Sequence, residues 1–261
     1  MSTNTFLSYL SFINLIIFNV RASNHFYGGS ITYKPTTSFG NGDGNVTIII
    51  TQTYLWSYPT IYCNDTLVRN QALIDLLGHT GYGVNLNCIS NCSTSGSYQP
   101  VPITPYCTDY STSLGFTIGQ RLDTVNLALG SYFSVAFQST SLPPLTLYSA
   151  QDGGSWSTAC TIDLSFKPNG RLNFAPIAPM PPYISIPVNG PQSIQIPVFD
   201  ADSDNLRCRF ATNSSVNECG SVCAPDSLPS SSVLFHNCTL VIVGHNANDT
   251  YAVTVQVTLF V

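Results

Sequence analysis

Charge is the property that this sequence has least of. Only 8% of its 261 residues are Asp, Glu, Lys or Arg, against about 25% in an average soluble protein. Eight basic residues against 13 acidic ones leave a net charge of -5, without any basic run. This composition excludes a coiled coil, a charged disordered chain and a basic binder of phosphate backbones. We therefore expect no nucleic-acid partner.

Signatures of catalysis are absent as well. The sequence has no Gly-x-Ser-x-Gly motif, and its four histidines are scattered, which gives no support for a Ser-His-Asp arrangement. A glycosidase would need two opposed carboxylates, and no spacing distinguishes such a pair among the aspartates. We expect no catalytic residues and no enzyme.

Long hydrophobic runs are limited to one, at residues 6–20. Val20 and Ala22 follow it with the small-residue spacing of a signal-peptide cleavage site, which would make Ser23 the first mature residue. The run is short for a bilayer span, although an uncleaved anchor is the alternative. We predict a signal peptide at residues 1–22, no transmembrane span in the mature piece, and a protein that is secreted or on the extracellular face of the cell.

Cysteines and glycosylation sequons both agree with export. So high a cysteine density is typical of disulfides in an oxidising compartment. The nine disulfide candidates are Cys63, Cys88, Cys92, Cys107, Cys160, Cys208, Cys219, Cys223 and Cys238. The six Asn-x-Ser/Thr sequons begin at Asn45, Asn64, Asn91, Asn213, Asn237 and Asn248. We predict N-linked glycans at these sequons.

The pairing of the cysteines is left open by the sequence. Five precede residue 173 and four follow it, so one of the first five is free, pairs across the boundary, or pairs with sequence missing from this chain. The spacings Cys88-x3-Cys92 and Cys219-x3-Cys223 also admit zinc. No histidine has ligand spacing to them, and export favours disulfides.

Most of the mature sequence has the period-two pattern of strands. The clearest segments are residues 30–34, 46–56, 114–118, 132–138, 161–167, 193–199, 239–243 and 250–261. One short helix is predicted at residues 67–77, capped by Asp65 or Thr66. The predicted fold class is all-β, with two disulfide-bonded β-sandwich domains joined by a Pro-rich linker and one short helix at most.

Four prolines within residues 173–182 mark this linker, because proline removes the backbone donors that a sheet needs. We predict an N-terminal β-sandwich at residues 23–172 and a second sandwich at residues 183–261. The second is close in length to an immunoglobulin-like or cadherin-like domain. A last strand that reaches the final residue fits a truncated chain as well as a finished one.

An acidic turn follows the predicted strand at residues 193–199. Asp200, Asp202 and Asp204 alternate there, and three carboxylates at such spacing repel one another unless a cation neutralises them. Hard Ca²⁺ prefers oxygen ligands of this kind. An EF-hand is excluded, since Asn205 and Ala211 occupy its glycine and glutamate positions. The alternatives are a Ca²⁺ site and a solvated Asp-rich turn.

Two segments resemble extracellular repeats. The linker that begins Asn173-x-Ala-Pro, together with the acidic turn, is similar to cadherin-like and immunoglobulin-like repeats. This resemblance implies that the three aspartates face calcium, with Asn173 as a weaker linker ligand. The opening His-Phe-x-Gly-Gly-x-Ile-x-Tyr at residues 25–33 resembles a module of invertebrate and bacterial surface proteins. The chain departs from the fuller cadherin pattern because its only glutamate is Glu218.

Aromatic residues are the remaining candidates for a binding site. Trp56 follows an inward-facing alternation and is expected in the core. The others are Tyr54, Tyr58, Tyr62, Tyr82, Tyr98, Tyr106, Tyr110, Tyr148 and Trp156. We predict a secreted or cell-surface glycoprotein module for adhesion, matrix or ligand binding, with Ca²⁺ as its only candidate cofactor and an extracellular protein or glycan as its partner. The alternatives are a carbohydrate-binding, lectin-like module and a secreted hydrolase.

Overall fold

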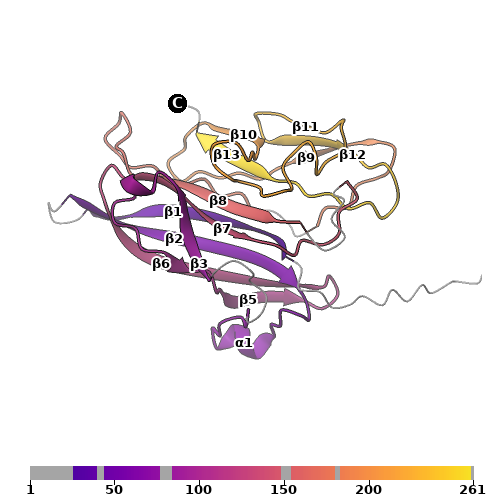
Figure 1. Cartoon of the computed structure of the whole chain (residues 1–261), viewed down its shortest axis with the longest axis horizontal. Helices are drawn as coiled ribbons and strands as arrows, with labels where there is room; N and C mark the ends of the chain where they lie inside the picture. The colour runs from indigo at the N-terminus through magenta and orange to yellow at the C-terminus, as the bar shows by residue number, and fades with distance from the viewer. Residues whose placement is uncertain (1–25, 40–43, 77–83, 148–153, 180–182, 260–261) are drawn as a thin grey trace, which may run out of the picture.

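The computed structural model describes residues 26–39, 44–76, 84–147, 154–179 and 183–259, in which strands dominate (Figure 1). The single α-helix of these residues, α1 (Asp65–Arg69), is five residues long. The prediction of an all-β chain with at most one short helix is confirmed. The predicted signal peptide, residues 1–22, lies outside the described residues.

Two four-stranded antiparallel sheets form the first half of the structure, which we call the N-terminal unit (residues 26–172). The first sheet has the order β1-β2-β6-β5, built from β1 (Phe26–Phe39), β2 (Asn45–Ser57), β6 (Phe116–Ala128) and β5 (Tyr106–Ser111). The second has the order β4-β3-β7-β8, built from β4 (Val101–Pro102), β3 (Asn85–Ser90), β7 (Tyr132–Ser139) and β8 (Trp156–Asp163). A 3₁₀ turn, η1 (Cys92–Thr94), follows β3.

The inner faces of these two sheets share one core, the N-terminal core. Along β2 the buried positions alternate as the period-two pattern predicts, and Trp56 is 1% exposed, which confirms its predicted place. Tyr54 meets Phe137 of the opposite sheet edge to face, with ring centroids 5.2 Å apart. Phe26 stacks on Trp156 at 3.6 Å. Each such aromatic pair adds about 0.5–1.5 kcal/mol beyond the burial of its area.

A smaller C-terminal unit (residues 183–259) lies beside β8 in Figure 1. One sheet has the order β11-β12-β9, built from β11 (Val233–Leu234), β12 (Thr239–Val243) and β9 (Pro191–Gln195). The other pairs β10 (Leu206–Phe210) with β13 (Val255–Leu259). Its own core consists of Ile196, Cys208, Leu228, Cys238, Leu240 and Ile242. Two separate cores agree with the predicted division of the chain, which stays a prediction.

The linker contacts both units over the part that the structure describes. Ala175 donates its N–H to the carbonyl of Tyr33 on β1, at 2.9 Å. Ile177 forms an isolated antiparallel bridge with Phe199 of the C-terminal unit. The linker is thus bonded through its backbone to the edge strand β1 of the N-terminal unit and to Phe199 of the C-terminal unit. Residues 180–182 of the predicted linker lie outside the described residues.

The predicted helix at residues 67–77 is wrong in its bounds. α1 begins earlier because the Oδ1 of Asn64, rather than Asp65 or Thr66, caps it by accepting the Leu67 N–H at 2.8 Å. After α1 the chain joins the sheet, where Ile74 donates its N–H to the carbonyl of Pro105. A helix this short is marginal by itself, so pairing with the neighbouring segment decides where it ends.

Several strand bounds also differ from the prediction. Of the segment expected at residues 161–167, only 161–163 are strand, as the end of β8, which begins at Trp156. Of the segment expected at 114–118, residues 116–118 are the start of the much longer β6. β6 was hidden because it carries a charged pair on its inner face. There Arg121 binds Asp123 at 2.8 Å, and Gln52 donates to the same carboxylate at 3.1 Å. A polar network inside a sandwich breaks the apolar alternation that marks a strand.

Candidate functional site

Four disulfides join eight of the nine cysteines, and each closes within one unit. The pairs are Cys63–Cys107, Cys88–Cys92, Cys208–Cys238 and Cys219–Cys223. The zinc alternative is therefore wrong, since both x3 spacings form disulfides. The odd residue is Cys160 on β8, which is free and buried. Burial raises the pKa of its thiol to about 12, so it carries no reactive thiolate at neutral pH.

The acidic turn folds around Asp200. Its Oδ1 accepts the N–H groups of Asp202 and Asp204, at 2.9 and 3.2 Å. One carboxylate oxygen from each of the three aspartates lies within 4.8 Å of the others. The structure thus brings together the three side chains that the sequence singled out.

The turn also meets the end of the N-terminal unit, which the sequence did not predict. The Lys167 ammonium forms ion pairs with Asp202 and Asp204, and the N–H of Phe174 donates to Asp202 at 3.2 Å. Burial raises the pKa of Asp202, but the hydrogen bonds from Lys167 and Phe174 outweigh it, so that pKa lies below its usual value. Burial and the adjacent Asp202 carboxylate raise the pKa of Asp200.

Three oxygen atoms at this junction are buried without a hydrogen-bond partner among the described residues. They are Oδ2 of Asp200, Oδ1 of Asp202 and Oδ1 of Asn173, the residue next to Phe174. Leaving such a group unsatisfied destabilises a fold by about 1–3 kcal/mol. One lysine against three aspartates also leaves two negative charges unmatched. An oxygen-only donor set with this charge fits a hard divalent cation.

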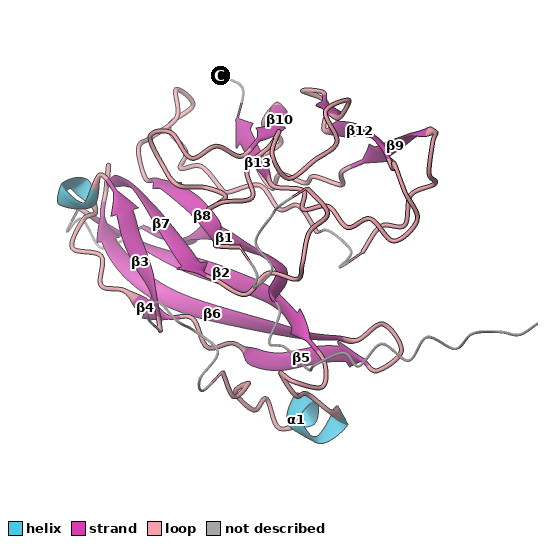
Figure 2. Ribbon diagram, turned by 45° about the vertical axis from the view of Figure 1, so that its right-hand side comes forward, coloured by secondary structure: helices cyan, strands magenta, loops and turns pink. Residues whose placement is uncertain are grey.

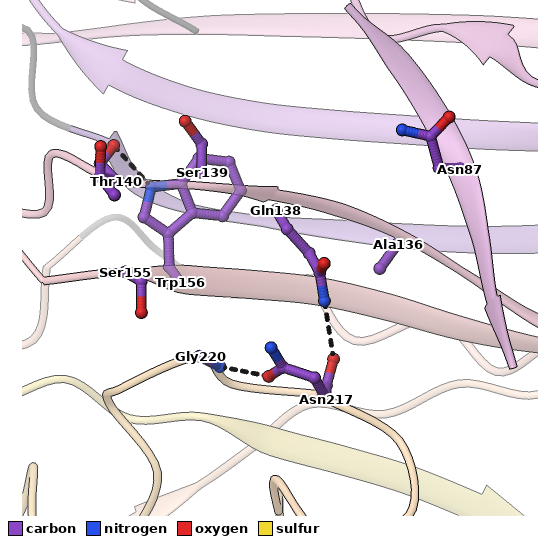
Figure 3. A pocket seen from close by; sticks show the side chains of 9 residues that line it. All are labelled: Asn87, Ala136, Gln138, Ser139, Thr140, Ser155, Trp156, Asn217 and Gly220. Atoms are coloured by element: carbon purple, nitrogen blue, oxygen red, sulfur yellow. Dashed lines mark hydrogen bonds between the residues drawn. The ribbon is translucent and has the colours of Figure 1, made fainter. Parts of the chain in front are cut away.

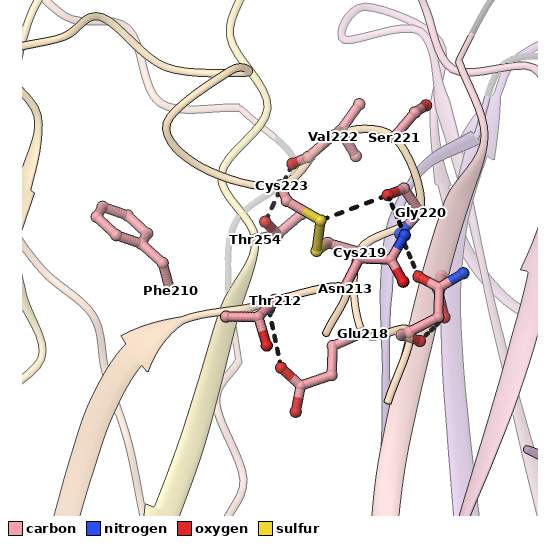
Figure 4. Close-up of a disulfide and its surroundings, with 12 residues drawn as sticks. Phe210, Thr212, Asn213, Glu218, Cys219, Gly220, Ser221, Val222, Cys223 and Thr254 are labelled. Atoms are coloured by element: carbon pink, nitrogen blue, oxygen red, sulfur yellow. Dashed lines mark hydrogen bonds between the residues drawn. A yellow bond between two sulfur atoms is a disulfide. The ribbon is translucent and has the colours of Figure 1, made fainter. Parts of the chain in front are cut away.

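A second contact between the units is made by residues 213–223, which we call the docking loop (Figure 4). Ser221 donates its N–H to the carbonyl of Ser155 at 3.0 Å, and the Ser157 hydroxyl donates to the carbonyl of Asn217 at 2.6 Å. Val222, 2% exposed, is part of the N-terminal core although it belongs to the other unit. A loop that fills its neighbour's core fixes the two units together more firmly than a flexible linker would.

The base of the docking loop is held by the chain's only glutamate. Both oxygens of Glu218 accept hydrogen bonds of 2.7 Å from Arg209 of β10, and one of them also accepts the N–H of Thr212. Burial raises the pKa of Glu218, but these hydrogen bonds outweigh it and hold the pKa below its usual value. Sequence reasoning missed this loop. Two sequence features could have indicated the loop: the Cys219-x3-Cys223 spacing and the lone glutamate, Glu218, next to Cys219.

The six sequons differ in exposure. The asparagine is half-buried at Asn45 and Asn64, and Asn64 caps α1. It is exposed at the other four sequons, Asn91, Asn213, Asn237 and Asn248. Two of these, Asn91 and Asn248, stand in turns with φ of 53° and 69°. The folded protein accommodates a glycan only where the asparagine reaches solvent, so exposure favours these four, of which Asn213 also donates its Nδ2 to the carbonyl of Gly220 at 3.4 Å.

The aromatic residues divide between core and surface. Tyr54, Trp56, Tyr98 and Trp156 are buried, while Tyr82 and Tyr148 lie outside the described residues. Beside α1, Tyr58 stacks between Tyr62 and Tyr110, with ring centroids 5.9 and 6.0 Å apart. Tyr62 is half exposed, and the Tyr110 hydroxyl donates to Asp65 at 3.0 Å. This cluster stabilises the helical corner around the Cys63–Cys107 disulfide.

No helix in the described part of the chain is long and apolar enough to cross a membrane. No family model matches the chain, and neither a curated protein nor a solved structure is significantly similar to it.

Proposed function

We propose that this chain is a secreted or cell-surface glycoprotein module for adhesion, matrix or ligand binding, with two β-sandwich units held in a fixed relation. Four disulfides support an extracellular setting, since they persist in oxidising compartments. The docking loop and the linker contacts support a rigid pair of units. A fixed pair suits a protein that presents or spaces a binding surface. Its partner would be an extracellular protein or glycan.

The observation that carries this proposal is the set of buried, unpartnered oxygens where the two units meet. We propose that Asp200, Asp202, Asp204 and Asn173 bind Ca²⁺, while Lys167 stays paired with Asp202 and Asp204. The ion would connect the linker residue Asn173 to the turn of the C-terminal unit. Calcium would therefore stiffen the junction, as the cadherin-like resemblance implies.

Calcium at about 2 mM should raise the unfolding temperature of the purified protein. Extracellular modules bind Ca²⁺ with Kd values of about 0.1–1 mM. A ligand that binds only the folded state then adds about 0.6–1.8 kcal/mol, and each kcal/mol raises the unfolding temperature of a domain as small as the C-terminal unit by about 4–8 °C. Differential scanning calorimetry with calcium and with excess chelator measures this shift.

Asp202→Asn should abolish the calcium shift, because it removes one charge while keeping the shape of the side chain. Asp226→Asn is the matched control, since Asp226 is an exposed aspartate of the same unit outside the turn. Magnesium at the same concentration should give a smaller shift. Equal unfolding temperatures with calcium and with chelator would mean that the turn is a solvated loop that pairs with Lys167 and binds no calcium.

Glycosylation should follow the exposure of the sequons. In protein secreted from a eukaryotic host, we expect glycans at Asn91, Asn213, Asn237 and Asn248, and much lower occupancy at Asn64, whose side chain caps α1. Peptide mass spectrometry after enzymatic removal of N-glycans reports the occupancy of each site. A fully occupied Asn64 together with an empty Asn213 would contradict the assignment by exposure.

A further inference from the structure

A polar cavity of about 260 Å³ lies where the docking loop meets the N-terminal unit (Figure 3). One wall comes from β3, β7 and β8 and the other from the loop. Its lining residues are Asn87, Ala136, Gln138, Ser139, Thr140, Ser155, Trp156, Asn217 and Gly220. Neither unit forms this cavity alone.

Three side-chain amides give the cavity its chemistry. The Nε2 of Gln138 donates hydrogen bonds to the Ser157 hydroxyl and to the carbonyl of Asn217. The Oδ1 of Asn217 accepts the Gly220 N–H at 2.8 Å. The remaining groups, Oε1 of Gln138 and Nδ2 of Asn217, make no hydrogen bond within the described residues. The whole amide of Asn87, an exposed residue, is equally free there. The acceptor of Gln138 and the donor of Asn217 are thus held in place by the bonds of the same amides, and all three amides offer groups to a ligand.

The lining also limits which ligand fits. It holds amides, hydroxyls and no charged side chain, so it offers no counter-ion to an anion or a cation. The volume is below the roughly 300–1,000 Å³ of pockets for drug-sized molecules. The indole of Trp156 stacks on Phe26 inside the core and offers no free ring face. A small, neutral ligand with several hydroxyl or amide groups matches these features.

We infer that this cavity, the amide pocket, binds one neutral sugar residue of a glycan. Asn87 would pair its donor and its acceptor with neighbouring hydroxyl groups, while Oε1 of Gln138 would accept from a hydroxyl and Nδ2 of Asn217 would donate to one. The inference depends on docking of the loop and not on calcium, so its failure would leave the proposed metal site untouched. It gives the proposed binding module a candidate class of ligand.

Saturation-transfer NMR tests the pocket with the methyl glycosides of glucose, mannose, galactose and N-acetylglucosamine, on protein freed of its own N-glycans. We expect at least one of them to bind with a Kd of about 1 mM, the affinity of a few polar contacts. Negatively charged N-acetylneuraminic acid should give no transfer. Titration of the glycosylated protein with the same sugar shows whether an N-glycan of this chain already fills the pocket, since its Kd would then rise.

Asn87→Ala should raise the Kd of the bound sugar at least about tenfold, equivalent to ~1.4 kcal/mol, without changing the unfolding temperature. Asn85→Ala is the control on the same strand, because Asn85 does not line the pocket. The inference is overturned if no sugar gives transfer at about 50 mM, fifty times that Kd. A Kd that Asn87→Ala and Gln138→Ala both leave unchanged overturns it equally, because the sugar then binds elsewhere.

Discussion

Gly220→Ala is expected to lift the docking loop from β8 and to lower the free energy of unfolding by about 3 kcal/mol or more. Gly220 has a φ of +65°, and a Cβ there would lie 2.6 Å from the carbonyl oxygen of Ser155 and 2.7 Å from the Cα of Trp156. Both are backbone atoms that cannot rotate away. The left-handed backbone accounts for about 1–2 kcal/mol, and exposure of Val222 adds about 1.5–3 kcal/mol.

Gly170→Ala separates these two contributions. Gly170 also has a left-handed backbone, with φ of +77°, but a Cβ there would meet nothing within 4 Å. Its substitution should lower stability by only about 1–2 kcal/mol. Urea unfolding gives the two free energies, and hydrogen exchange at the Ser221 amide reports whether the loop has left Ser155. Equal losses in both variants, with protection at Ser221 retained, would show that the loop tolerates the methyl group.

Removal of the Cys208–Cys238 disulfide should destabilise the C-terminal unit by roughly 3.5 kcal/mol, as chain entropy predicts for a loop of this length. The bond spans 30 residues, and both cysteines are about 1% exposed within the small C-terminal core. Without it the unfolded chain gains freedom while the core loses a covalent link between β10 and the turn before β12. In calorimetry, Cys208→Ala/Cys238→Ala should produce an early transition for the C-terminal unit.

The Cys219–Cys223 disulfide is the matched comparison, because its cysteines are four residues apart. The same entropy relation gives only about 2 kcal/mol for its removal. That loss should appear at the docking loop rather than in the C-terminal core. If the double alanine variant at Cys219 and Cys223 were the less stable of the two, docking and not chain entropy would dominate the stability of the C-terminal unit.

The sequence by itself determined the fold class and the inward face of β2. Strand periodicity is a local property, so the alternation from Val46 to Trp56 identified β2 and its inward face before any partner was known. The acidic turn was equally visible, because its three aspartates lie within five residues. Cysteine number and distribution predicted disulfides in both units, with one cysteine left over.

Tertiary structure alone decided the contacts between residues far apart in the chain. It chose Cys160 as the unpaired cysteine, and it placed Lys167 against Asp202, 35 residues away. It also joined Ser157 to Asn217, 60 residues away, and so formed both the docking contact and the amide pocket. No local pattern encodes such pairs, because their distance depends on how the strands between them are ordered and paired. The candidate metal ligands could be predicted from the sequence, whereas their lysine partner and the polar cavity exist only once both units are folded and docked.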